Sequence, residues 1–194
     1  MKIAGVILAA GFSARMGREK LTLPSGSSTI IERVLEEAAS SSMDDVCLVY
    51  RSREVGDTGR RYGVRIVYNE MTEEGMASSI VKGVSASGRA DGYMIMLGDM
   101  PFVTREIIDG IIGRFNDAGD IVVPVCSGRD GHPVLIGGGY SDELLALGDD
   151  IGARPVLSSH ADRIIRLECG NSVLTDIDTP EEYIRIGSEV NGYI

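Results

Sequence analysis

Short apolar runs alternate with amphipathic helical patterns along this chain of 194 residues, and this alternation constrains the fold more than any other feature. The runs have the length of buried strands, and the segments between them repeat apolar residues at helical spacing. The predicted strands are 3–8, 46–50, 64–68, 93–97, 121–125, 133–136 and 164–167. The predicted helices are 30–38, 77–87, 104–115, 142–147 and 153–158, with a last one from Pro180. This order predicts an α/β fold with a mostly parallel sheet.

The region between the second and third strands has the weakest pattern. The polar span 51–61 predicts a loop or a poor helix. No linker, repeat or low-complexity tract interrupts the chain, and hydrophobic residues make up 43% of it, so one domain over 1–194 is expected. No apolar run reaches the roughly 18 residues of a membrane span. The first apolar run is read as a strand and not as a signal peptide.

The composition excludes several kinds of site. A net charge of −10 argues against non-specific nucleic-acid binding, which needs a basic face. Cys47, Cys126 and Cys169 are widely spaced and form no disulfide framework or zinc motif, so reduced thiols in a cytoplasmic protein are expected. With two histidines in the chain, a metal is expected to be a hard ion held by oxygen, such as Mg²⁺.

The segment from Leu8 to Lys20 follows the first strand and carries two glycines and three cations. Glycine lets backbone N–H groups approach a phosphate, and Arg15, Arg18 and Lys20 can neutralise its charge. The spacing matches neither the P-loop nor the dinucleotide-binding pattern. A surface turn with solvated basic residues remains the alternative.

Carboxylates follow two other apolar stretches. Asp99 lies directly after the strand ending at Leu97, at the same edge of the predicted sheet as the opening loop. It is a candidate Mg²⁺ ligand, or it turns the chain or caps the next helix. Asp176 and Asp178 point the same way in an extended stretch, so one of them can complete a metal site while the other caps the final helix.

Two further segments have structural and functional interpretations. The segment 69–79 after the third strand needs no role beyond that of a connecting loop and helix cap. His132, in Gly131-His132-Pro133, is by itself more typical of a structural turn than of a catalyst.

Several strings together resemble one family. Leu-Ala-Ala-Gly-x-Ser-x-Arg-Met-Gly-x-x-Lys-Leu-x-Leu-Pro, from Leu8 to Pro24, is similar to the signature of the MobA-like nucleotidyltransferases. The match continues in the family's order at 98–101, 131–134, 148–157 and 176–180, and it is most similar to the molybdenum cofactor cytidylyltransferases. The resemblance implies the nucleotide-diphospho-sugar transferase fold, a three-layer structure with a mixed seven-stranded sheet and helices on both faces.

The resemblance also implies residue roles. Arg15, Lys20 and Asp99 are the expected catalytic residues, and Asp99 and Asp178 the expected ligands of a Mg²⁺ cofactor. The expected nucleotide-binding residues are Leu8, Ala9, Ala10, Gly11, Gly17, Lys20, Gly75 and Ser78. The expected acceptor-binding residues are His132, Gly152 and Arg154.

The implied reaction is nucleotidyl transfer from an NTP to a phosphate monoester. The guanylyltransferases typically carry Leu-Ala-Gly-Gly where this chain has Leu-Ala-Ala-Gly, so Ala10 favours CTP as donor and molybdopterin as acceptor. A molybdoenzyme is an expected partner, with no nucleic acid or membrane. The alternatives are transfer to another phosphorylated metabolite, such as a sugar or polyol phosphate, and a non-catalytic nucleotide-binding regulator.

Overall fold

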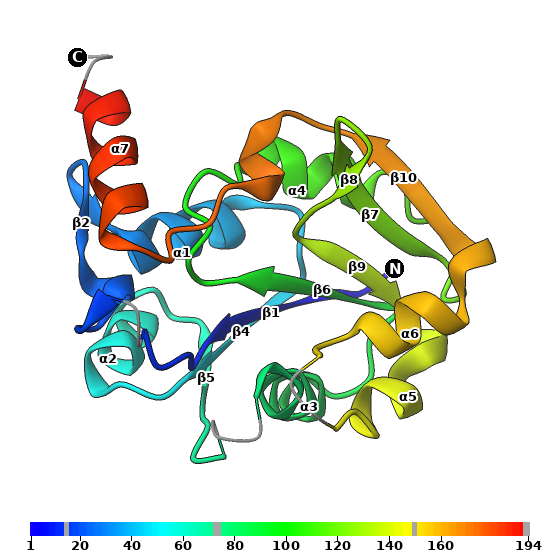
Figure 1. Cartoon of the computed structure of the whole chain (residues 1–194). Coiled ribbons are helices and arrows are strands. Elements are labelled where there is room, and N and C mark those ends of the chain that lie inside the picture. Colours follow the sequence, from blue (N-terminus) through cyan, green and yellow to red (C-terminus); the bar gives the residue numbers. More distant parts are fainter. Residues whose placement is uncertain (14–15, 72–74, 149–150, 192–194) are drawn as a thin grey trace.

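The computed structural model describes residues 1–13, 16–71, 75–148 and 151–191, without the side chains of 186–191. Its centre is an eight-stranded sheet in the order β10-β7-β9-β6-β1-β4-β5, with β8 paired to β7 (Figure 1). The strands are β1 (Ile3–Ala9), β4 (Asp45–Tyr50), β5 (Arg65–Tyr68), β6 (Gly92–Leu97), β7 (Ile121–Cys126), β8 (Arg129–Asp130), β9 (Val134–Gly137) and β10 (Ile164–Glu168). All seven predicted strands are confirmed, and β8 is a two-residue addition that the sequence pattern did not indicate.

The sheet is mixed, as the family resemblance implies. β1 pairs in parallel with both β4 and β6, β4 with β5, and β7 with β10. β9 runs antiparallel to both β6 and β7. The chain passes from β1 to β4 and β5 and then returns to β6 on the other side of β1, so the strand order reverses at β1. In such sheets ligands bind beyond the carboxyl ends of the strands at this reversal.

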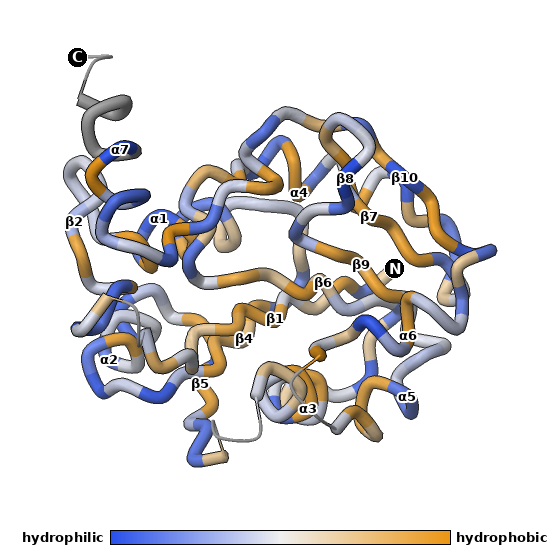
Figure 2. The backbone as a smooth tube through the Cα atoms, in the orientation of Figure 1, coloured by the Kyte–Doolittle hydropathy of each residue, from blue (hydrophilic) through white to orange (hydrophobic). Residues whose placement is uncertain are grey.

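Helices cover both faces. α1 (Ile30–Ser40), α2 (Arg53–Arg61) and α4 (Arg105–Ile112) pack on one face, in a core that includes Ile3 and Ile7 of β1. α3 (Met76–Ser87), α5 (Ser141–Leu145) and α6 (Arg154–Ser159) pack on the other, with Ala4 and Val6. Alternate residues of β1 therefore serve two cores, and Figure 2 shows hydrophobic residues along the central strands. α7 (Pro180–Asn191) ends the described chain, and β2 (Pro24–Ser25) and β3 (Ser28–Thr29) form a hairpin before α1. Among the described residues, no helix has the length and apolarity needed to cross a bilayer.

The span 51–61 is a helix over most of its length, so the prediction of a loop or poor helix was too weak. Ser52 caps α2 by accepting the backbone N–H of Val55. The buried side of α2 includes Gly56 and Gly59, which lie against Tyr50 and Leu48 of β4. The face that packs is thus partly made of glycine, and a search for large apolar residues at helical spacing could not find it.

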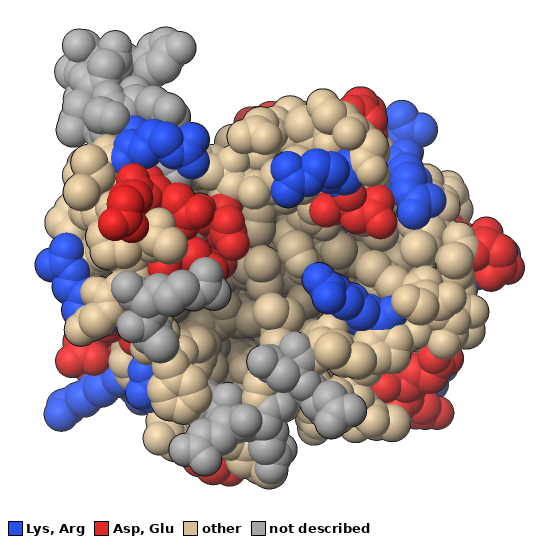
Figure 3. Space-filling model, in the orientation of Figure 1, with Lys and Arg blue, Asp and Glu red and all other residues tan. Residues whose placement is uncertain are grey.

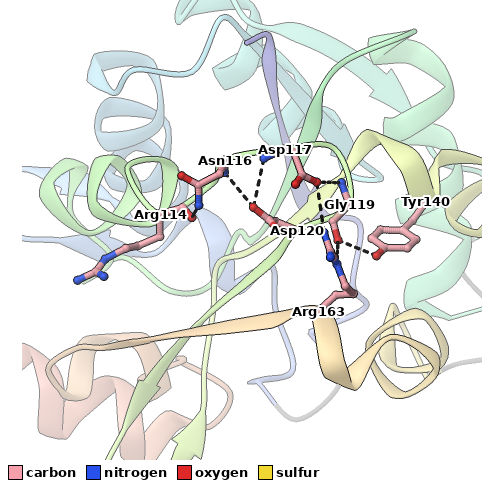
Figure 4. A network of polar contacts seen from close by, with 7 residues as sticks. All are labelled: Arg114, Asn116, Asp117, Gly119, Asp120, Tyr140 and Arg163. Carbon is pink, nitrogen blue, oxygen red and sulfur yellow. Dashed lines mark hydrogen bonds and ion pairs between the residues drawn. The ribbon is translucent and has the colours of Figure 1, made fainter.

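A polar network fixes the amino end of β7 (Figure 4). The Asp120 carboxylate accepts two backbone N–H groups of the preceding turn, at 3.0 and 3.2 Å. The Arg163 guanidinium, just before β10, donates to the Gly119 carbonyl at 3.1 Å and lies 3.4 Å from an Asp120 oxygen. The Tyr140 hydroxyl donates to the same carbonyl at 2.7 Å. These contacts join segments from three parts of the chain at the edge of the sheet opposite the carboxyl ends of β1 and β6.

Candidate active site

The loop after β1 is held by its own polar contacts. Ala9 and Ala10 are buried, whereas Gly11 and Phe12 are exposed. The Ser13 hydroxyl accepts the backbone N–H of Lys20 and donates to the Glu19 carboxylate, both at 3.3 Å. Met16 is buried in the core on the α1 side and anchors the middle of the loop. The Ser13 contacts therefore join the first half of the loop to its end, while the tip of the loop, Gly11 and Phe12, faces solvent. Arg15, one of the expected catalytic residues, lies outside the described residues.

Lys20 lies at the centre of the site. It opens a short 3₁₀ turn, Lys20–Thr22, and Glu19 caps this turn by accepting the N–H of Leu21. The ammonium nitrogen lies 2.7 Å from Oδ2 of Asp99 and 2.5 Å from Oδ1 of Asp178. Only 9% of Lys20 is exposed. The fold thus brings together three of the predicted residues, from the loop after β1, the end of β6 and the segment before α7.

The charge of Lys20 is stabilised by its neighbours. Burial alone would lower its pKa, but the negative charge of Asp99 and the hydrogen bonds to Asp178 and Asp99 outweigh this effect and raise the pKa. Lys20 therefore stays protonated at neutral pH. A buried ammonium group with a raised pKa can bind an anionic group and keep its own proton.

Gly98 allows Asp99 to lie close to the loop. Its N–H donates to the Leu8 carbonyl at 3.0 Å, which extends the pairing of β6 with β1. A Cβ on Gly98 would lie 3.1 Å from that carbonyl oxygen and 3.2 Å from the Cβ of Ala9, so a larger residue would push the strands apart. The Asp99 carbonyl accepts the N–H of Ile177 at 3.1 Å, which joins the segment 176–178 to the same point.

The two candidate aspartates before α7 have different surroundings. The cap of α7 is Thr179, whose hydroxyl accepts the N–H of Glu182 at 3.2 Å, while Glu182 accepts the N–H of Thr179 at 2.9 Å. Asp178 is thus not needed as a cap, and its carboxylate reaches Lys20. Asp176 as a residue is exposed, but its carboxyl is partly desolvated, and this desolvation together with the charges of Asp99 and Asp178 raises its pKa.

The carboxylates of the site could supply some, but not all, of the ligands of a hard cation. Among the described residues, no group of three or more His, Cys, Asp or Glu side chains has the arrangement of a complete metal site. Asp99 and Asp178 do converge on one point, which the Lys20 ammonium occupies. One or two carboxylates, completed by substrate phosphates and water, are the usual protein ligands of Mg²⁺. The site therefore fits Mg²⁺ that arrives with a phosphorylated substrate.

The segment after β5 is organised by Asn69. This side chain is fully buried, and its amide nitrogen donates to the hydroxyls of Ser78 at 3.0 Å and Ser79 at 2.9 Å. Its amide oxygen accepts the N–H of Met71 at 2.9 Å. Gly75 precedes α3 with a φ of 79°, a conformation that favours glycine. Ser78 thus holds the turn before α3 as well as lying in the predicted nucleoside segment.

The three predicted acceptor-binding residues lie just before β9 and around the start of α6. The pKa of His132 is lowered by burial and by the charge of Arg154, while the charge of Asp99 opposes the change. Within the described residues His132 Nδ1 is enclosed and has no hydrogen-bond partner. Gly152 lies against Met76 at the start of α3, whereas Arg154 is exposed. Figure 3 shows a hollow over the central strands, with acidic side chains gathered beside the start of α7 and basic side chains across from them.

Sequence reasoning missed two residues at this edge. Asn69 was in the segment considered, but its role in holding both serines was not predicted. Arg51 was given no role within a span predicted as a loop or a poor helix; it follows β4 directly, and its guanidinium carbon lies 4.7 Å from the centre of the Phe12 ring. Its position immediately after an apolar strand of a parallel sheet was the available signal.

Comparisons with known proteins find one family model and several relatives that cover most of the chain. A family model described as the MobA-like NTP transferase domain matches residues 5–164. The molybdenum cofactor cytidylyltransferase of Escherichia coli (strain K12) is 26% identical over 181 residues, which cover 92% of each chain. The purine catabolism protein PucB of Bacillus subtilis (strain 168) is 29% identical and covers 93% of this chain and 94% of its own. A solved structure of Rv0371C from Mycobacterium tuberculosis H37Rv, in complex with manganese, is 26% identical with a TM-score of 0.78, over 97% of this chain and 99% of its own.

Proposed function

Because the chain belongs to the MobA-like NTP transferase family, we propose that this nucleotidyltransferase moves CMP from CTP onto the phosphate of molybdopterin and releases pyrophosphate. The observation that carries the proposal is the position of Lys20 between Asp99 and Asp178, next to the loop that follows β1. A buried cation and two carboxylates lie beside a glycine-containing loop. This arrangement suits a reaction in which phosphates are bound and negative charge develops on their oxygens.

The triphosphate binds along the loop from Ala10 to Gly17, with its charge met by Arg15 and Lys20. Leu8, Ala9 and Gly11 shape the start of this loop, and Gly75 and Ser78 lie on the nucleoside side. Support comes from the exposed tip of the loop and from the raised pKa of Lys20, which burial, the charge of Asp99 and its hydrogen bonds together determine. The protonated lysine can move from the carboxylates to a phosphate oxygen without losing its charge.

Asp99 and Asp178 would hold Mg²⁺, and the manganese complex of the Mycobacterium tuberculosis relative supports a divalent cation in this fold. When bound, Mg²⁺ would neutralise charge on the phosphate oxygens as a Lewis acid. The acceptor phosphate attacks the α-phosphorus, a new P–O bond forms, and the bond to the β-phosphate breaks as pyrophosphate leaves. A phosphate monoester with a second pKa near ~6 is already largely ionised at neutral pH, so no general base is required. Catalysis then rests on positioning and charge stabilisation.

The acceptor binds on the side of His132, Gly152 and Arg154. The exposed guanidinium of Arg154 can bind an anion as a fork, whereas His132 is largely enclosed. The preference for CTP rests on Ala10, whose position in the opening motif is a glycine in the guanylyltransferases, and on the cytidylyltransferase relative of Escherichia coli.

The test is pyrophosphate release with Mg²⁺ and each of CTP, GTP, ATP and UTP, with and without molybdopterin. The proposal expects release with CTP plus molybdopterin, and none with the Asp99→Asn variant as a matched control. Release with a sugar or polyol phosphate in place of molybdopterin would favour the other acceptor class. Nucleotide binding without turnover for any pair would favour a regulator.

A further inference from the structure

Arg51 lies between the two segments that are proposed to bind the nucleotide. It follows β4, and β4 lies between β1 and β5 in the sheet. The loop after β1 is the proposed phosphate site, and the segment after β5 holds Asn69 and Gly75. Since parallel strands end at the same edge, Arg51 lies at that edge between the two.

The guanidinium of Arg51 lies over an aromatic ring. Its central carbon lies 4.7 Å from the centre of the Phe12 ring, and Phe12 is 51% exposed on the loop after β1. Within the part of the chain that the structure describes, Nε of Arg51 is enclosed without a hydrogen-bond partner. This distance is that of a cation–π contact, which helps to position the guanidinium. An enclosed donor without an acceptor is unfavourable, so this position suits a group that gains its acceptor from a ligand.

The position of Arg51 favours the base over the phosphates. Asp99, the proposed metal ligand, follows β6, which is two strands from β4. Strands lie about 4.8 Å apart, so the end of β4 is about 10 Å from the end of β6. If the phosphates lie at Asp99 and Lys20, the base at the other end of the nucleotide lies near the ends of β4 and β5. Arg51 is at this position.

We propose that Arg51 reads the nucleobase and selects cytosine; this inference rests on the proposed function. A guanidinium offers only donors, in a planar fork. Cytosine presents two adjacent acceptors, O2 and N3, which match such a fork. The matching acceptor pair of guanine, O6 and N7, lies on its major-groove edge, so a fork placed to meet the pairing edge of a pyrimidine would meet N–H donors in guanine. Uracil presents one acceptor and one donor there. A site built to pair with a ligand's polar edge rejects analogues that leave its own groups unpaired.

The experiment measures equilibrium binding of CTP, GTP and inorganic tripolyphosphate by calorimetry, with Mg²⁺ and without acceptor. The variants are Arg51→Met and Arg51→Lys, which keeps the charge but loses the fork. The matched control is Arg53→Met, because Arg53 is two residues away, fully exposed and paired with Asp57. We expect both Arg51 variants to bind CTP about 10- to 100-fold more weakly, the loss expected for one bidentate base contact. Their affinity for tripolyphosphate should stay within about threefold, and the control should match wild type.

Two results would overturn the inference. A parallel loss for CTP, GTP and tripolyphosphate in Arg51→Met would make Arg51 a phosphate contact, and unchanged CTP binding would remove it from the site. A wild-type protein that binds GTP more tightly than CTP would overturn the choice of CTP in the proposed function as well. Failure of molybdopterin as acceptor would leave the inference intact, because the binding measurement uses no acceptor.

Discussion

The ammonium nitrogen of Lys20 lies 2.7 Å from a carboxylate oxygen of Asp99, although the two residues are 79 positions apart in the chain. The contact joins the loop after β1 to the end of β6, the two strands at which the order of the sheet reverses. Asp178 reaches the same ammonium from a third segment, 158 positions from Lys20. The loops that are proposed to bind phosphate and metal are thus fixed relative to each other by one side chain.

Replacing Lys20 with Met should lower turnover by at least about 100-fold, the usual loss when a positioned charge-stabilising group is removed. The uncharged methionine side chain cannot neutralise the negative charge of a phosphate or of the Asp99 and Asp178 carboxylates. Steady-state pyrophosphate release measures the effect, and circular dichroism checks the fold. Lys82→Met is the control, because Lys82 pairs with Glu70 away from Asp99. A Lys20→Met rate within a few-fold of wild type would remove Lys20 from the reaction.

Asp178 and Asp176 can be separated by metal binding. Asp178→Asn should weaken Mn²⁺ binding in the presence of CTP by about tenfold or more, because a carboxylate ligand becomes a neutral amide. Asp176→Asn should change it by less than about threefold, since Asp176 does not contact Lys20 and Asp178 does. Electron paramagnetic resonance of free Mn²⁺ gives the affinity without reference to activity. The reverse order of effects would make Asp176 the ligand.

Much of the fold could be predicted from the sequence because strands and most helices here have regular apolar patterns. α2 could not, since its packed side uses Gly56 and Gly59 in place of large apolar residues. The sequence also could not show which of Asp176 and Asp178 faces Lys20, because side chains two positions apart in an extended stretch point the same way. The choice between the two depends on Thr179 as the cap of α7 and on a lysine 158 positions away. Arg51 was missed because its neighbour Phe12 comes from another strand end, and such proximity exists only in the folded sheet.

Two glycines inside helices should respond oppositely to alanine. Gly83 of α3 lies directly against the Val6 side chain of β1, so a Cβ there would clash with it. Gly83→Ala should destabilise the protein by about 1–3 kcal/mol, because overpacking outweighs the gain in helix propensity. Gly110 of α4 is exposed, and a Cβ there would lie 3.6 Å from Leu167, an ordinary contact. Gly110→Ala should stabilise by about 0.5–1 kcal/mol. Urea denaturation compares both variants with wild type, and a stable Gly83→Ala protein would contradict the packing of α3 on β1.

The capping box of α1 should make stability depend on acid pH. The N–H of Thr29 donates to the Glu32 carboxylate, and this bond lowers the pKa of Glu32 below 4.5. A lowered folded-state pKa contributes stability that is present above the unfolded value and is lost as pH falls through the folded value. Glu32→Gln keeps an oxygen that can accept the Thr29 N–H but loses the negative charge at the helix N-terminus, so it should cost about 0.3–1 kcal/mol at pH 7 and progressively less below pH 4.5. Urea midpoints from pH 7 to pH 3 measure this, with exposed Asp162→Asn as the control. A difference that stays constant with pH would contradict the assignment.

The fate of the α-phosphate of the nucleotide distinguishes nucleotidyl transfer from other reactions of the triphosphate. The purified protein is incubated with Mg²⁺, molybdopterin and CTP labelled at either the α- or the γ-phosphate, and the products are separated. We expect the α-label to move to the molybdopterin product and the γ-label to appear in pyrophosphate, and we expect neither product with Lys20→Met or Asp99→Asn. An α-label that stays in CTP, or that appears only as free CMP, would contradict transfer to this acceptor.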